Sequence, residues 1–122
     1  MKTYGHTQIE DLLSGFRVVV LGTCGAAGPQ AGQVGAEIKD GWLILKLDRT
    51  SDHLFNLECR PELVILTPAW ELHGTGQVLT AGATVFLHPW QAAIRVTPTR
   101  LHILDRESGR RIETVDFPAG AP

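Results

Sequence analysis

The sequence has few cysteines and no cysteine-rich motif. Cys24 and Cys59 are far apart in the chain, and they form no CxxC pair and no His/Cys cluster at the spacing of metal ligands. We therefore expect two reduced thiols with structural roles. The histidines outside the central region are scattered as well, with no pair spaced for a metal: His6, His73, His88 and His102. The sequence therefore predicts no metal site.

Long apolar runs and an excess of charge are also missing. No stretch reaches the roughly 18 apolar residues that span a bilayer. Residues 1–7 are polar, where a signal peptide would have an apolar core. Because 11 basic residues nearly balance 13 acidic ones, no general field attracts the chain to nucleic acid or to an anionic membrane. We therefore expect a cytoplasmic protein that binds neither nucleic acid nor membranes.

What the chain does contain is a series of short apolar segments separated by turn residues. Its 122 residues predict a single domain over 1–122, with 118–122 as a loose tail. The Thr-x-x-Glu box at Thr7 predicts a short N-terminal helix that ends at Gly15. Strands are expected at 16–21, 30–39, 42–47, 62–67, 71–79, 93–97, 100–105 and 111–117. This pattern is typical of a mainly antiparallel barrel with helical inserts.

Three proline and glycine positions refine the strand pattern. Asp40-Gly41 predicts a tight hairpin turn between the strands at 30–39 and 42–47. Pro98 is expected to separate the strands at 93–97 and 100–105. Pro89 also argues against a central strand, so the segment 85–92 is left without an assigned element.

The chemistry of the chain concentrates between residues 46 and 51. A lysine at a strand end, Lys46, is followed by Arg49 in a polar turn and by the hydroxyls of Thr50 and Ser51. A helix is predicted from about Asp52 to Cys59, where Pro61 ends it. The first N–H groups of a helix have no partner within it. Basic side chains, hydroxyls and free N–H groups at one helix start are typical of a phosphate site.

A simpler interpretation of the same residues stays open. Ser51 can cap the helix with no ligand present, and Asp52 is favourable at the positive end of the helix dipole. Lys46 and Arg49 can equally be solvated surface charges.

Three of the expected strands, at 16–21, 42–47 and 62–67, have apolar residues on both faces. A barrel built from one small chain covers only their inner face. Within 42–47, Leu45 is predicted to point into the core and Ile44 outward. A symmetric homodimer would cover the outer face, and the alternative is cover by the chain's own helices.

The order of the motifs carries a resemblance. The motifs are Val18-Val19-Val20-Leu21-Gly22-Thr23 with Gly28-Pro29, Asp40-Gly41-Trp42-Leu43, Thr50-Ser51-x-x-x-x-Asn56-Leu57-x-x-x-Pro61 and Gly74-x-Gly76-Gln77-Val78. In this order, over about residues 7–105, they resemble the pyridoxamine 5'-phosphate oxidase-like, FMN-binding split β-barrel family. The resemblance implies a mainly β (α+β) fold, a six-stranded antiparallel split β-barrel with short flanking helices. It also implies a homodimer that holds FMN at the subunit interface.

The resemblance further implies which residues would hold the cofactor phosphate. Carried onto this chain, they are Lys46, Arg49, Thr50, Ser51, His53 and Asn56. His53 stands where the family commonly has a lysine or arginine. A histidine with an ordinary pKa is mostly neutral at pH 7.5, although Asp52 beside it would favour its charged form.

We therefore expect an FMN-binding protein that acts as a flavin-dependent oxidoreductase on an unknown substrate, with the redox chemistry supplied by the cofactor. No catalytic residue is predicted. The alternative is a dimeric binding or stress-related module of the same fold that holds deazaflavin, haem or no cofactor, as members of the superfamily do. Trp42, Trp70 and Trp90 could each flank a flavin or belong to the core or an interface.

Overall fold

The computed structural model describes residues 15–26, 28–79 and 87–117. The described elements are β1 (Val18–Thr23), β2 (Gln30–Lys39), β3 (Trp42–Asp48), α2 (Asp52–Cys59), β4 (Glu62–Leu66), β5 (Trp70–Leu79), β6 (Gln91–Leu104) and β7 (Arg111–Asp116). The predicted N-terminal helix, the loop at 80–84 and the tail at 118–122 lie outside the described residues. Among the described residues, no helix is both long and apolar enough to cross a membrane.

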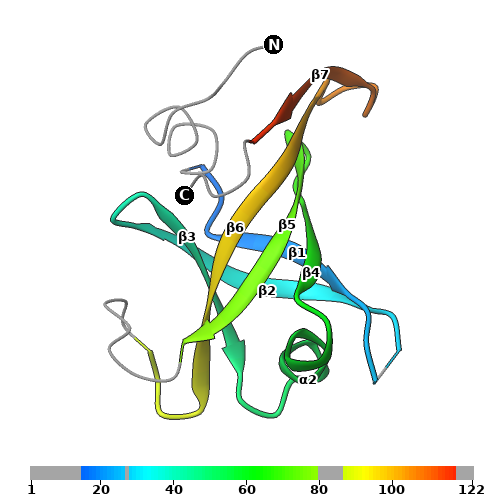
Figure 1. The fold of residues 1–122 in the computed structure, drawn as a ribbon. Helices are drawn as coiled ribbons and strands as arrows, with labels where there is room; N and C mark the ends of the chain where they lie inside the picture. The colour runs from blue at the N-terminus through cyan, green and yellow to red at the C-terminus, as the bar shows by residue number, and fades with distance from the viewer. Residues whose placement is uncertain (1–14, 27, 80–86, 118–122) are drawn as a thin grey trace.

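The strands form one antiparallel sheet that closes on itself. Their order is β3-β2-β1-β4-β5-β6-β7, and an additional pairing of β3 with β6 closes the first six strands into a barrel. β7 pairs only with the C-terminal part of β6, from Arg100 to Leu104. Figure 1 shows β5 and β6 crossing over β1 and β2, with α2 at one end of the barrel. The expected six-stranded antiparallel barrel is confirmed.

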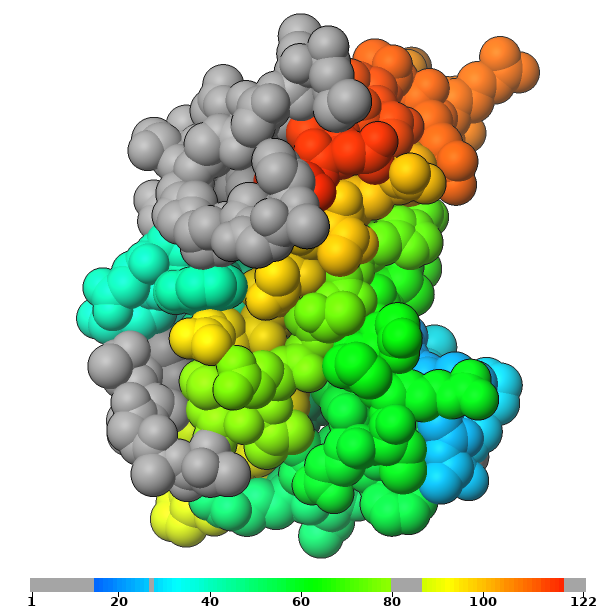
Figure 2. Space-filling view, viewed as in Figure 1, coloured from blue at the N-terminus to red at the C-terminus, as the bar shows by residue number. Residues whose placement is uncertain are grey.

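The core lies between the inner faces of these strands. Alternate residues of β3 point inward, and Leu45 meets Ile94 across the closing pair, both fully buried. Figure 2 shows α2 and β4, in green, packed beside β5 on the face toward the viewer. The hairpin between β2 and β3 turns at Asp40 and Gly41, with φ of 53° and 80°. Positive φ at both positions is what a type I′ hairpin turn requires, so this prediction is confirmed.

The three tryptophans have different environments. Trp70 is 1% exposed in the core, and its ring meets Phe16 edge to face. Trp42 lies on the outer face of β3, where the Arg95 guanidinium sits 4.5 Å from its ring centre. Trp90 is exposed and stacks on His88.

The expectation that Pro98 separates two strands is wrong. β6 runs unbroken from Gln91 to Leu104, with Pro98 inside it and opposite Gly74, where the register of β5 and β6 shifts. On the other edge of β6, pairing with β3 ends at Val96 and pairing with β7 begins at Arg100. The ladder is therefore already interrupted at Pro98 on both sides, and the missing N–H costs little there.

The outer face of β3 is also covered differently from the expectation. Ile44 does point away from the main core, but it is only 5% exposed, and it packs with Ala93 in a second apolar cluster. The partners of that cluster are Trp42, Leu79 and Leu87. Ile44 therefore belongs to the packing of the subunit itself. Of the three strands with apolar residues on both faces, β1 and β4 keep exposed apolar residues on the outer face, Val18 and Leu66.

A substitution at Gly74 tests the close contact between β5 and β6 at the register shift. An added Cβ would overlap the carbonyl oxygen of Thr97 in the β6 backbone, which cannot move without disturbing the pairing. We expect Gly74→Ala to lower the free energy of unfolding by about 1–3 kcal/mol, measured by urea denaturation. Gly15→Ala is the control, because a Cβ there meets no atom within 4 Å. Equal stability of the two variants would mean that β6 moves freely at this point.

Candidate functional site

The start of α2 is formed by a serine cap. Ser51 has extended backbone angles, and its Oγ accepts a hydrogen bond of 3.2 Å from the backbone N–H of His53. Asp52 occupies the first turn, where a negative charge favours the helix dipole. The capping role of Ser51 is thus confirmed. The same hydroxyl keeps its own proton, which remains able to donate to a ligand.

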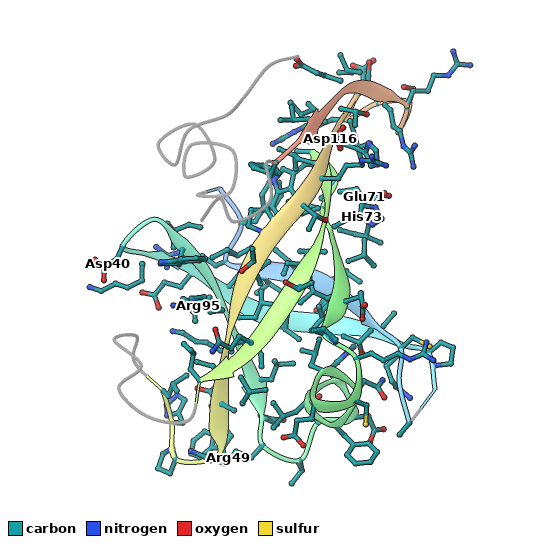
Figure 3. All side chains as sticks on the ribbon, viewed as in Figure 1. Asp40, Arg49, Glu71, His73, Arg95 and Asp116 are labelled. Atoms are coloured by element: carbon teal, nitrogen blue, oxygen red, sulfur yellow. The ribbon has the colours of Figure 1, made fainter. Side chains whose placement is uncertain are left out.

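The turn before the helix is fastened to the turn before β6. The backbone N–H of Arg49 donates to the carbonyl of Trp90 at 2.8 Å, and the Nε of the Arg49 side chain donates to the carbonyl of Pro89 at 2.9 Å. Arg49 and Thr50 are both exposed, and Figure 3 shows Arg49 at the end of the barrel near α2. These contacts fasten both the backbone and the side chain of Arg49, and the residue stays exposed at the surface.

Lys46 has a different environment from the other predicted phosphate ligands. It lies on the outer face of β3, and its ammonium pairs with the Glu37 carboxylate at 3.1 Å. The ion pair gives the Lys46 ammonium a negative partner, which weakens its attraction for a phosphate. Lys46 is also part of the wall of a cavity of about 420 Å³, lined by Phe16, Arg17, Gly35, Ala36, Glu37, Ile38, Leu43 and Lys46.

His53 and Asn56 turn inward, toward the end of β1. The Nδ1 of His53 lies 2.8 Å from the Thr23 hydroxyl, and the Asn56 amide donates to the same hydroxyl and to the carbonyl of Gly28. Asn56 is completely buried, and a Cβ at Gly25 would press against its backbone. These two side chains therefore tie α2 to β1 and to the loop after it.

The expected charge behaviour of His53 needs a correction. The sequence suggested an ordinary imidazole that Asp52 biases toward its charged form. In the structure, burial lowers the pKa of His53, and the Asp52 carboxylate offsets this only in part. His53 is therefore a neutral group at pH 7.5, held against Thr23.

The structure thus divides the six predicted residues into three groups. Arg49, Thr50 and Ser51 share the helix start, Lys46 pairs with Glu37 on the sheet, and His53 with Asn56 is directed inward. Thr23 was not predicted to have a role. Its importance comes from the fold, which brings the end of β1 against a helix about 30 residues later in the chain, and no local signal marks it.

The buried His53 makes a prediction about pH. Its pKa is lower in the folded chain than in the unfolded chain, so the unfolded state binds more protons between those two values. The His53 contribution to stability is therefore complete above about pH 6.5 and is lost as the pH falls from there toward the folded pKa. In urea denaturation between pH 7.5 and 5, we expect His53→Asn, which can keep the bond to Thr23, to lose less stability than the wild type. Parallel curves would contradict the inward, neutral state of this side chain.

No family model and no curated protein sequence matches the chain. Solved structures do match its fold. General stress protein 26 from Bacillus anthracis superimposes with a TM-score of 0.69 at 17% identity, over 92% of this chain and 98% of that one. A Clostridium acetobutylicum protein related to general stress protein 26, described as of the pyridoxinephosphate oxidase family, gives 0.67 at 15% identity, over 93% and 94%.

A third structure, the haem storage protein HutZ from Vibrio cholerae, gives a TM-score of 0.62 at 12% identity, over 80% of this chain and 92% of that one. Identities this low establish the fold alone. The chain therefore has the split-barrel fold of the pyridoxamine 5'-phosphate oxidase-like proteins, as the resemblance of its motifs predicted.

Proposed function

We propose that this protein binds FMN and that Arg49, Thr50 and Ser51 hold its phosphate. The observation that carries the proposal is an exposed arginine and two hydroxyl residues at the start of an eight-residue helix. The fold supports the proposal, because a protein described as of the pyridoxinephosphate oxidase family has the same fold. A helix start favours an anion through its N–H groups and its dipole.

The described contacts are compatible with this role. Pro89 and Trp90 anchor Arg49, so binding would order little additional chain. Ser51 accepts a bond from the His53 N–H and can donate its own proton to a phosphate oxygen. His53, Asn56 and Lys46 act differently in this proposal, since the first two support the helix from below and Lys46 is paired with Glu37.

The proposed activity is that of a flavin-dependent oxidoreductase. FMN, when bound, would supply the electron or hydride transfer. The contribution of the chain is to fix the phosphate end and to hold α2 at the barrel end through Thr23.

A second candidate is a module of the same fold that binds haem or no cofactor. The inward position of His53 favours this candidate, because the phosphate site then lacks a positive charge at that position. The ion pair of Lys46 with Glu37 favours it as well. Among the similar structures, HutZ is described as a haem storage protein and the Bacillus anthracis protein as a stress protein.

Titration with FMN and with riboflavin tests the first candidate. Charge-assisted hydrogen bonds contribute on the order of 1.5–3 kcal/mol each, so FMN should bind at least tenfold more tightly than riboflavin. Arg49→Gln should remove most of that difference, as measured by quenching of flavin fluorescence. Arg110→Gln, a change of an exposed arginine in the turn before β7, is the matched control and should keep it.

Two results would count against FMN. Equal affinity for the two flavins would show that the phosphate is not held at this helix start. An absence of flavin binding, together with a haem absorption band in the protein after haem is added, would favour the second candidate.

We also propose that the protein is a homodimer joined through an outer apolar patch, which consists of Val18, Val20, Val64 and Leu66. Val20 and Leu66 face each other across β1 and β4, and Val64 is the next outward residue on β4. Val18 is 54% exposed and Leu66 is 38% exposed. A second copy would remove these side chains from water through a symmetric contact.

Leu66→Glu tests the dimer. In sedimentation equilibrium at micromolar concentration, the wild type should be dimeric and this variant monomeric, because a charge would be buried at the interface. The fold of the variant should survive, since Leu66 is partly exposed in a single subunit. Ile112→Glu changes an equally apolar residue on β7 that is 66% exposed, and it should stay dimeric. A monomeric wild type would contradict the proposal.

A further inference from the structure

Three side chains on the outer face of β5 and β6 come together although they are far apart in the sequence. Glu71 of β5 lies directly opposite His102 of β6, and His73 follows two residues after Glu71 on the same face. Figure 3 shows Glu71 and His73 side by side on β5. The antiparallel register therefore assembles two imidazoles and one carboxylate that no sequence spacing indicated.

The ligand atoms of this cluster converge. One nitrogen of each histidine and one Glu71 oxygen all lie within 4.8 Å of one another. His73 Nε2 is 2.6 Å from Glu71 Oε2, and His102 Nε2 is 3.8 Å from the same oxygen. Nitrogen and oxygen ligands about 2.0–2.2 Å from a tetrahedral zinc ion are roughly 3.4 Å apart. Side-chain rotations that shift the three ligand atoms by about 1 Å would therefore bring them to tetrahedral spacing.

His102 is already oriented as a metal ligand would be. It is 5% exposed, and its Nδ1 lies 2.8 Å from the Thr114 hydroxyl on the neighbouring β7. In the tautomer that donates its Nδ1 proton to Thr114, Nε2 carries a lone pair and is available to a metal ion.

The surroundings leave space for an ion and its remaining ligand. His73 and His102 line a cavity of about 370 Å³ whose other wall residues are Thr99, Arg100, Arg111 and Asp116. Arg100 is paired with Asp116 at 2.6 Å. Arg111 lies 3.7 Å from the Glu71 carboxylate and is 62% exposed, so it can move away when a cation takes its place.

We propose that Glu71, His73 and His102 form a Zn²⁺ site, with a fourth position open to this cavity. Two imidazoles and a carboxylate suit zinc, and three protein ligands leave a position for water or a small anion. Thr114 is a positioning residue that fixes the His102 ring. Arg111 competes with the metal for Glu71. The site uses one chain only and is independent of the flavin proposal.

The test measures Zn²⁺ affinity by competition with a chromophoric chelator at pH 7.5. The protein carries Cys24→Ser and Cys59→Ser, because both thiols are exposed and can bind zinc themselves. We expect one Zn²⁺ per chain. Co²⁺ in place of Zn²⁺ should give visible absorption typical of nitrogen and oxygen ligands.

Four variants locate the ion. His73→Ala, at a side chain that is 44% exposed, should fold normally and weaken binding at least tenfold. Thr114→Val should weaken it by about 10- to 100-fold, the usual cost of losing such a support. Arg111→Gln should tighten binding several-fold, because it removes a positive charge close to the ion. His88→Ala alters an exposed histidine elsewhere and should leave the affinity unchanged.

Three results would overturn the proposal. The first is an absence of 1:1 binding in the cysteine-free protein. The second is wild-type affinity in His73→Ala, and the third is unchanged affinity in Arg111→Gln, either of which would place the ion elsewhere. A gain of affinity in Arg111→Gln cannot come from misfolding, so this variant keeps the test decisive even if His73→Ala or Thr114→Val destabilises the chain.

Discussion

The pairing of β3 with β6 is the contact on which the rest of the structure depends. It joins the two ends of a six-stranded sheet and places Leu45 opposite Ile94 in the centre of the core. Without it, both strands would have unpaired edges, and their inner faces would meet water. Closure also decides where α2 lies, because the short helix must connect the end of β3 to the start of β4 across one end of the barrel (Figure 1).

Stability and binding compete at this end of the barrel. Thr23 meets both His53 and Asn56, and these contacts hold the helix against β1. A buried polar group needs a partner, so the three side chains satisfy one another at the expense of reaching a ligand. What remains for an anion is the exposed side of the helix start, with Arg49, Thr50 and the capping Ser51. The candidate phosphate site is therefore smaller than the resemblance implied, with one fixed cation in place of several.

The outer surface of the sheet is divided in a similar way. On β3, Ile44 is covered by the chain itself, whereas Val18 and Leu66 on β1 and β4 remain exposed. Directly beside β4, strands β5 and β6 carry charged and imidazole side chains in register, with Glu71 next to Leu66 on one side and opposite His102 on the other. Neighbouring strands thus present first an apolar and then a polar surface. This division supports two different uses of one sheet, association with a second copy and binding of a cation.

The sequence by itself determined the local structure. Alternating apolar residues predicted most of the strands, Asp40-Gly41 predicted the hairpin turn, and Ser51 with Pro61 bounded the helix correctly at 52–59, because these features depend on neighbouring residues. Only the tertiary structure decided the rest. Pro98 lies within a strand because the ladder is already interrupted beside it. His53 is buried because its ring packs against Thr23. His73 meets His102 because the register of β5 and β6 places them side by side. Each of these depends on which distant segments pair, and no spacing along the chain records that.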